Sequence, residues 1–175
     1  MPRLPLVWGA TRTELARRYP SDDLLPDGLP MTRAISVAAP PELTWRWLGQ
    51  MAVAPYSYDW IDNRGRRSPQ TLTPGADQLE LGQRMAVVFE LVSFDAPHQW
   101  TGLTTPRGER MFGPVAMTFA AEPDGDGSRI VGRLVAGTAG RFSRLRANTL
   151  AWGDLVMMRR QFLNLKGLAE RDARV

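Results

Sequence analysis

Four segments that alternate apolar and polar residues, followed by one segment of helical spacing, constrain the fold of this 175-residue chain most strongly. Alternation of period two is typical of a strand with one buried face, and it predicts strands at 83–94, 99–104, 114–122 and 129–137. The connections at 95–97 and 124–127 are short enough for antiparallel hairpins. In the segment 149–171 an apolar stripe recurs at helical spacing and predicts one long helix: Leu155, Met158, Phe162, Leu165 and Ala169.

The first third of the chain adds another strand and short helices. Residues 33–37 alternate as a strand, after which Pro40 and Pro41 stop it and open a helix that reaches about Met51. Thr11 and Glu14 have the spacing of a capping box, which predicts a short helix up to about residue 19. The predicted architecture is α+β with a helix-grip fold, in which a curved antiparallel sheet wraps around a long C-terminal helix and short helices follow the first strand.

The stretch from Thr32 to Asn63 reads TRAISVAAPPELTWRWLGQMAVAPYSYDWIDN. This strand, this helix and the loop at 56–63, which we call the aromatic loop, resemble a bacterial, polyketide cyclase/dehydrase-like branch of the SRPBCC superfamily. The START-like members of that superfamily have the helix-grip fold. The resemblance runs through almost the whole chain and departs at 52–55, where the branch commonly shows a run containing Gly and Arg. It implies an N-terminal extension with a short helix at 1–30 and a helix-grip domain at 31–175. It does not imply a substrate, because the superfamily hosts carriers, enzymes and regulators alike.

Composition excludes several function classes. A hydrophobic content of 43% with 23% charged residues is typical of a soluble globular domain. With no Cys and one His, the chain has no disulfide, thiolate metal site or His-rich zinc site, and no cofactor is predicted. No apolar run approaches the roughly 20 residues of a membrane span, and the N-terminal residues lack the apolar core of a signal peptide. We therefore expect a cytoplasmic protein without a membrane span.

Positive charge is high but dispersed. The calculated pI of 10.3 comes almost entirely from scattered arginines, and no recognition motif accompanies them, so no nucleic-acid partner is predicted. Two small clusters could be solvated loops or an anion-facing rim: Arg64, Arg66 and Arg67, and Arg141, Arg144 and Arg146.

Strand parity predicts a cavity between the sheet and the long helix. On the last strand Leu134 should face inward, with Arg129 and Arg133 outside. The side chains expected to line the cavity as ligand-binding residues are Phe89, Trp100, Met117, Phe119, Leu134, Met158 and Phe162. The alternative is a solid hydrophobic core without a pocket.

The aromatic loop is expected to border the cavity entrance with three further ligand-binding residues, Tyr56, Tyr58 and Trp60. In an extended segment these three would share one side. The polar residues Asp59, Asp62 and Asn63 have three possible roles: local hydrogen bonds that hold the loop, contacts with a ligand, or proton transfer.

No catalytic residue is assigned. The single His98 follows Pro97 in a predicted turn, residues 107–110 look like a solvated hairpin tip, and Asp154 is expected to cap the last helix. The preferred function is binding of an apolar small molecule, such as a lipid, polyketide or aromatic metabolite. The alternative is a cyclase/aromatase-like enzyme acting on a polyketide-type substrate in the same cavity. The chain is expected to be a monomer or a homodimer.

Overall fold

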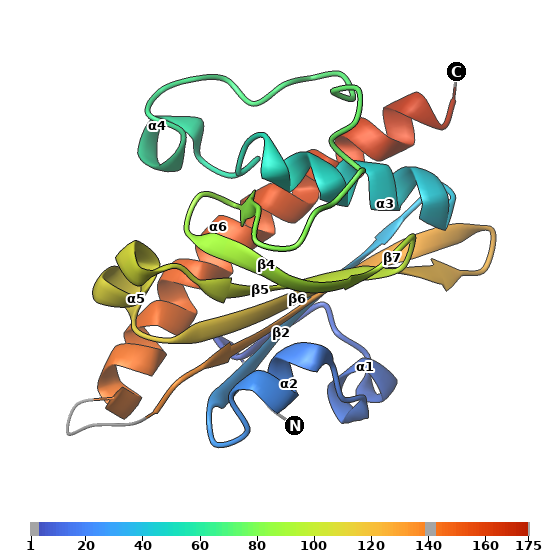
Figure 1. The fold of residues 1–175 in the computed structure, drawn as a ribbon. Coiled ribbons are helices and arrows are strands. Elements are labelled where there is room, and N and C mark those ends of the chain that lie inside the picture. The colour runs from blue at the N-terminus through green and yellow to red at the C-terminus, as the bar shows by residue number, and fades with distance from the viewer. Residues whose placement is uncertain (1–3, 139–142, 175) are drawn as a thin grey trace.

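The computed structural model describes residues 4–138 and 143–174, with side chains described at 4–138 and 147–174. Its centre is one seven-stranded sheet with the order β1-β2-β7-β6-β5-β4-β3 (Figure 1). The pair β1 and β2 is parallel, and the other neighbours are antiparallel. The strands are β1 (Val7–Trp8), β2 (Leu29–Val37), β3 (Arg84–Met85), β4 (Phe89–Asp95), β5 (Gln99–Thr104), β6 (Val115–Asp124) and β7 (Gly127–Ala136).

Helices cover both faces of this sheet (Figure 1). The α6 face carries α3 (Pro41–Gly49) and the long α6 (Ser143–Asp172), whereas the N-terminal face carries α1 (Arg12–Ala16) and α2 (Pro20–Leu24). The shorter helices are η1 (Gln50–Ala52), α4 (Asp59–Asp62) and α5 (Pro106–Phe112). The predicted helix-grip fold of class α+β is confirmed. Across the described ranges, no helix combines the length and the apolar character that a membrane span needs.

The predicted strand 83–94 is interrupted between β3 and β4. Ala86 and Val87 have φ values of 42° and 71°, and the Ala86 amide donates to the Met51 carbonyl at 2.8 Å. The chain therefore turns out of the sheet where it meets η1. As a result Val87 is 43% exposed, although regular alternation along 83–94 would put it on the same inward face as Met85 and Phe89.

Two helix boundaries differ from the sequence prediction. Residues 107–110, expected as a loop, lie in α5, where Pro106 occupies the first turn and Thr105 Oγ1 accepts from the Gly108 amide at 3.2 Å. This Thr-Pro start is an ordinary N-cap signal that the prediction overlooked. The long helix α6 begins at Ser143 rather than near Thr149, which places Asp154 well inside the helix instead of at its N-terminus.

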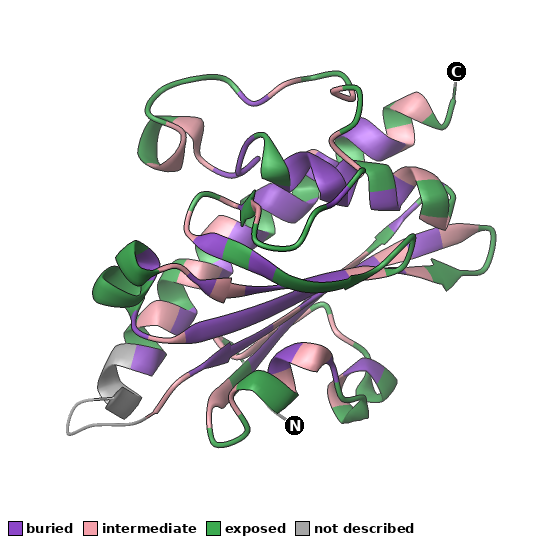
Figure 2. Cartoon of the chain, in the orientation of Figure 1, coloured by how far each residue is buried: buried purple, intermediate pink, exposed green. Residues whose placement is uncertain are grey.

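The core lies between the sheet and the helices of the α6 face (Figure 2). Trp100 of β5 stacks on Phe119 of β6 with ring centroids 4.9 Å apart, and Phe119 meets Phe162 of α6 edge-on at 5.7 Å. A Cβ added at Gly132 of β7 would lie 2.4 Å from Met158 Cε, so the glycine lets α6 approach the sheet closely.

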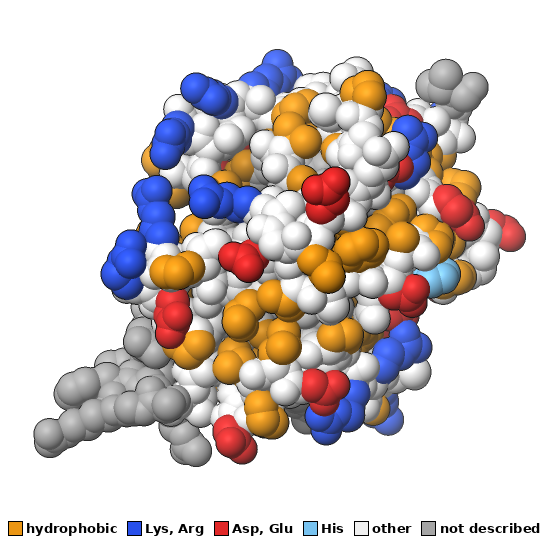
Figure 3. Space-filling model, in the orientation of Figure 1, with side chains coloured by type: hydrophobic (Ala, Val, Ile, Leu, Met, Phe, Trp, Pro, Cys, Tyr) orange, Lys and Arg blue, Asp and Glu red, His pale blue; other side chains and the backbone are white. Residues whose placement is uncertain are grey.

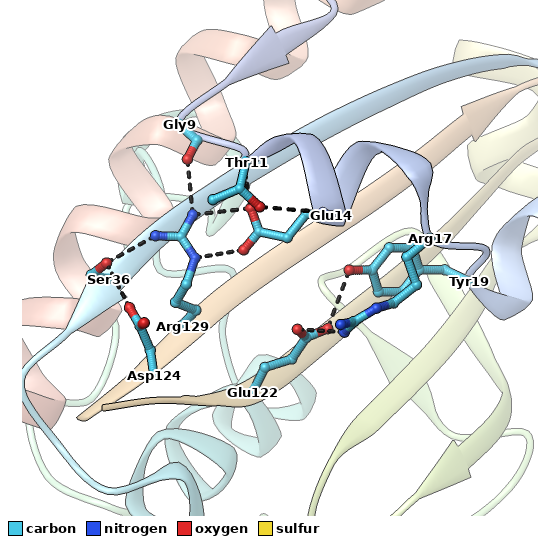
Figure 4. Close-up of polar contacts among 9 residues, drawn as sticks. All are labelled: Gly9, Thr11, Glu14, Arg17, Tyr19, Ser36, Glu122, Asp124 and Arg129. Carbon is cyan, nitrogen blue, oxygen red and sulfur yellow. Dashed lines mark hydrogen bonds and ion pairs between the residues drawn. The ribbon is translucent and has the colours of Figure 1, made fainter. Parts of the chain in front are cut away.

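The N-terminal segment covers the sheet face that parity left outside (Figure 4). Arg129 of β7 donates to Glu14 Oε1 at 2.5 Å and to the Gly9 carbonyl at 2.9 Å. Beside it, Glu122 accepts from Tyr19 Oη at 3.2 Å and pairs with Arg17 at 2.5 Å. Burial alone would raise the pKa of Glu14, but its hydrogen bonds with Arg129 and with its own helix cap lower it below the ordinary value.

The arginines of the last strand lie on the sheet face away from α6, as parity indicated, but the N-terminal segment covers this face. Arg133 donates to Asp22 Oδ1 at 2.9 Å, and its neighbour Val131 is fully buried under the N-terminal helices. Residues before 31 also contribute β1 and the start of β2 to the same sheet. The segment assigned as an extension thus packs on the sheet face formed by β5, β6 and β7.

Candidate ligand-binding groove

The aromatic loop begins with a buried anchor, Tyr56. Its φ of 57° turns the chain, and its ring packs edge-on against Trp47 of α3 with centroids 6.0 Å apart. The Tyr56 hydroxyl donates to Gln50 Oε1 at 3.4 Å. Burial raises the pKa of Tyr56, and the charge of Asp59 adds a smaller rise, so this phenol stays neutral.

The other two aromatic residues of the loop are not buried with Tyr56. Tyr58 precedes the single turn of α4 and is half-buried, and Trp60 within that turn is 76% exposed. The expected alternation fails because the segment coils into a helical turn instead of running extended.

Acidic and amide side chains hold the loop in this shape. Asp59 Oδ2 accepts from the Ser68 amide at 2.8 Å, and Asp59 Oδ1 accepts from Ser68 Oγ at 2.5 Å. Asn63 Nδ2 donates to the Arg66 carbonyl at 2.6 Å. Asp62 accepts from Ser57 Oγ, while its Oδ1 is buried without a hydrogen-bond partner. Burial raises the pKa of Asp62; its bond with Ser57 opposes this rise, and the charge of Asp59 adds to it.

Two amide side chains of α6 fasten the loop to that helix. Gln161 Nε2 donates to the Pro55 carbonyl at 2.5 Å, and Asn164 Nδ2 donates to the Tyr56 carbonyl at 2.9 Å. Between the loop and α6 lies a groove of about 560 Å³. Its loop side includes Tyr58 and Trp60, and its helix side includes Leu163 and Gly167.

The groove is lined by aromatic, aliphatic and polar side chains, and two of its lining residues are arginines. Arg67 from the loop and Arg160 from α6 both border it and are exposed. Neither arginine has an ion-pair partner among the described residues. Asp59 also borders the groove, but both of its oxygens accept from Ser68. Within the described ranges, no group of three or more His, Asp and Glu side chains is placed to hold a metal ion.

The structure separates the predicted ligand-binding residues into two groups. Tyr56, Tyr58, Trp60 and Asp59 border the groove, with Asp62 and Asn63 in the loop beside it. The remaining seven are buried in the core: Phe89, Trp100, Met117, Phe119, Leu134, Met158 and Phe162. Trp100, Phe119 and Phe162 have no surface that a water molecule can reach. These three rings therefore offer no open surface to a ligand in this structure.

A buried ion pair between β2 and α6 was missed by the sequence analysis. Arg33 has no exposed surface, and its Nη2 lies 3.1 Å from Asp154 Oδ2, whose side chain is 9% exposed. Arg33 Nη1 donates to the Leu6 carbonyl at 2.7 Å, and Nη2 donates to the Ala151 carbonyl at 3.3 Å. Burial raises the pKa of Asp154 to about 6, although Arg33 opposes the rise. The alternation of β2 indicated that Arg33 faces α6, because Arg33 shares its strand face with Ile35.

No protein-family model matches the chain, and no curated protein matches it. Among solved structures, the di-domain ARO/CYC StfQ from the steffimycin biosynthetic pathway is 14% identical, with a TM-score of 0.54, over 87% of this chain and 54% of that one. Protein NE0264 from Nitrosomonas europaea is 10% identical with a TM-score of 0.51, covering 83% of this chain and 97% of that one.

Protein MLL2253 from Mesorhizobium loti has a TM-score of 0.50 at 16% identity, over 81% of this chain and 97% of its own. The sheet, the long C-terminal helix and these matches define the fold: the chain has the helix-grip fold of these solved structures. At such low identities the likeness concerns the fold, and the groove has to be interpreted from its own residues.

Proposed function

We propose that this protein binds a small, largely apolar molecule in the groove between the aromatic loop and α6. The observation that supports this best is the groove itself, about 560 Å³ in volume, with Tyr58 and Trp60 on one wall and Leu163 on the other. Small-molecule sites typically measure about 300–1,000 Å³ and are lined by apolar and aromatic groups with a few polar ones. Exposed aromatic rings supply contact area while keeping a polar edge in water.

The groove is a better site than the space between the sheet and α6. A ligand placed there would have to displace rings such as Phe119 and Phe162, which are in contact and sealed from solvent. In the groove, the walls are already separated and their backbone is fixed by Gln161 and Asn164. Binding would therefore cost little reorganisation of the protein.

A fluorescence titration tests this proposal with the neutral, apolar probe N-phenylnaphthylamine. Probe emission should rise on binding, and Trp60→Ala should weaken the affinity about fivefold, the worth of one aromatic contact. Trp152→Ala is the matched control, because Trp152 is also an exposed tryptophan but does not border the groove. Equal affinities for the wild type and both variants would argue against a groove site.

A cyclase/aromatase-like reaction is the second candidate function. The fold likeness to an aromatase/cyclase structure supports it, and so does Asp62, a carboxyl beside the groove with a raised pKa and one unpartnered buried oxygen. Such a carboxyl suits proton transfer. If a polyketide-type substrate is turned over and Asp62→Asn abolishes turnover while probe binding persists, the protein is an enzyme and not only a binding protein.

A further inference from the structure

The helix side of the groove contains a glycine that the packing of this chain does not require. Gly167 lies inside α6, and glycine is a poor helix former. A Cβ built at Gly167 would meet no atom within 4 Å, and its backbone is not in the left-handed region. Neither sterics nor conformation explains the residue. What the missing side chain does is leave the helix backbone open toward the groove, where a flat group can approach closely.

The two arginines of the same groove form no ion pair in the described structure, although the Asp59 carboxylate also borders the groove. Arg160 stands on α6 and Arg67 on the facing loop, and neither is paired. The carboxylate of Asp59 is turned to Ser68 and accepts two hydrogen bonds there. Figure 3 shows further basic side chains gathered over α4 and the loop after it, where Arg64 and Arg66 are exposed. This side of the molecule favours an anion.

We propose that the groove takes a flat aromatic molecule that carries an anionic group, such as a carboxylate or sulfonate. This inference rests on the proposed function and specifies its ligand class. The ring lies over the open backbone at Gly167, beside Trp60, and the anionic group lies between Arg67 and Arg160. Guanidinium groups bind oxyanions by charge-assisted, often bidentate hydrogen bonds, and two of them on opposite walls would orient the ligand.

Two probes that differ by one anionic group test the charge. Anilinonaphthalene sulfonate and neutral N-phenylnaphthylamine share their aromatic body, so only the sulfonate distinguishes them. The sulfonate should bind more tightly, and Arg160→Gln and Arg67→Gln should each weaken it about threefold, leaving the neutral probe unchanged. Arg66→Gln is the control, since Arg66 is exposed on the same loop but does not border the groove. Salt at about 0.5 M should weaken only the sulfonate.

The outcomes separate this inference from the proposed function. If the neutral probe binds and the sulfonate gains nothing, or loses nothing in the arginine variants, the anionic ligand class is wrong while the groove remains a binding site. If neither probe binds, the proposed function fails and the inference falls with it.

The prediction that a flat ring lies over the backbone of Gly167 is tested by adding a side chain at this position. Gly167→Leu should weaken both probes at least tenfold without lowering the thermal midpoint of unfolding, because leucine is the better helix former and a Cβ at this position meets no atom within 4 Å. Gly153→Leu is the matched control: a Cβ at Gly153 also meets nothing within 4 Å, and this glycine of α6 does not border the groove. If Gly167→Leu binds both probes as tightly as the wild type, the ring does not lie over the backbone of Gly167.

Discussion

Replacing Arg33 by methionine is expected to lower the free energy of unfolding by about 3–5 kcal/mol at neutral pH. The substitution keeps much of the buried volume but leaves the Asp154 carboxylate without its cation, and removes the donors to the carbonyls of Leu6 and Ala151. A buried charge that loses its partner keeps the whole cost of leaving water. Urea denaturation of the wild type and the variant measures the difference.

The double variant Arg33→Met with Asp154→Leu is the control for this effect. It replaces the pair by apolar side chains, and we expect it to recover most of the lost stability, because Arg33 Nε already lacks an acceptor and Asp154 Oδ2 lacks a well-aligned donor. A single variant as stable as the wild type would contradict a buried, coupled pair. So would a double variant that is no more stable than the single one.

The pH dependence of stability gives a second readout of the same pair. The pKa of Asp154 is raised from 3.8 to about 6, so the folded protein holds this proton more tightly than the unfolded chain does. Ionisation therefore opposes folding, and the contribution of Asp154 to stability should rise as pH falls through about 6 towards 4. Comparing denaturation of the wild type and the double variant at about pH 8 and about pH 5 isolates this contribution. The stability difference between them should shift in favour of the wild type at the lower pH; an unchanged difference would contradict it.

Phe162→Ala is expected to be the other severe substitution, at about 3–5 kcal/mol of lost stability. The Phe162 ring is fully buried and meets Phe119 at 5.7 Å and Trp8 at 6.5 Å, so truncation leaves a cavity between α6, β6 and β1. Leu163→Ala is the neighbouring control, since Leu163 is 43% exposed and should cost about 0.5 kcal/mol or less. A Phe162→Ala loss below about 1 kcal/mol would contradict the packing of α6 on the sheet.

Periodicity predicted the elements whose pattern is set by one buried face. The strand predicted at 99–104 coincides with β5 (Gln99–Thr104), and Phe162 lies in the buried stripe of α6 as its spacing indicated. Parity also assigned Val131 to the face away from α6, where it lies, but it did not predict that the N-terminal helices bury this residue. Alternation cannot reveal that both faces of a strand are covered.

The features that the sequence did not predict depend on contacts between residues far apart in the chain. Asp154 was interpreted as a helix cap because the start of α6 was expected near Thr149 and not at Ser143, and its partner Arg33 lies far away in sequence on β2. The aromatic loop was identified correctly as an unusual segment, but its turn at Tyr56 and its docking on Asn164 depend on tertiary contacts. The groove is a product of that docking, so only its loop residues could be named in advance.

The central claim, that the groove rather than the helix–sheet core takes the ligand, is tested most directly by following tryptophan indole resonances during titration with N-phenylnaphthylamine. Trp60 lies at the groove, Trp100 lies in the core with an unpartnered indole N–H, and Trp152 is exposed elsewhere on α6. We predict a saturable shift of the Trp60 resonance, with Trp100 and Trp152 unchanged. A saturable shift of Trp100 without one of Trp60 would contradict this account and place the ligand between sheet and helix.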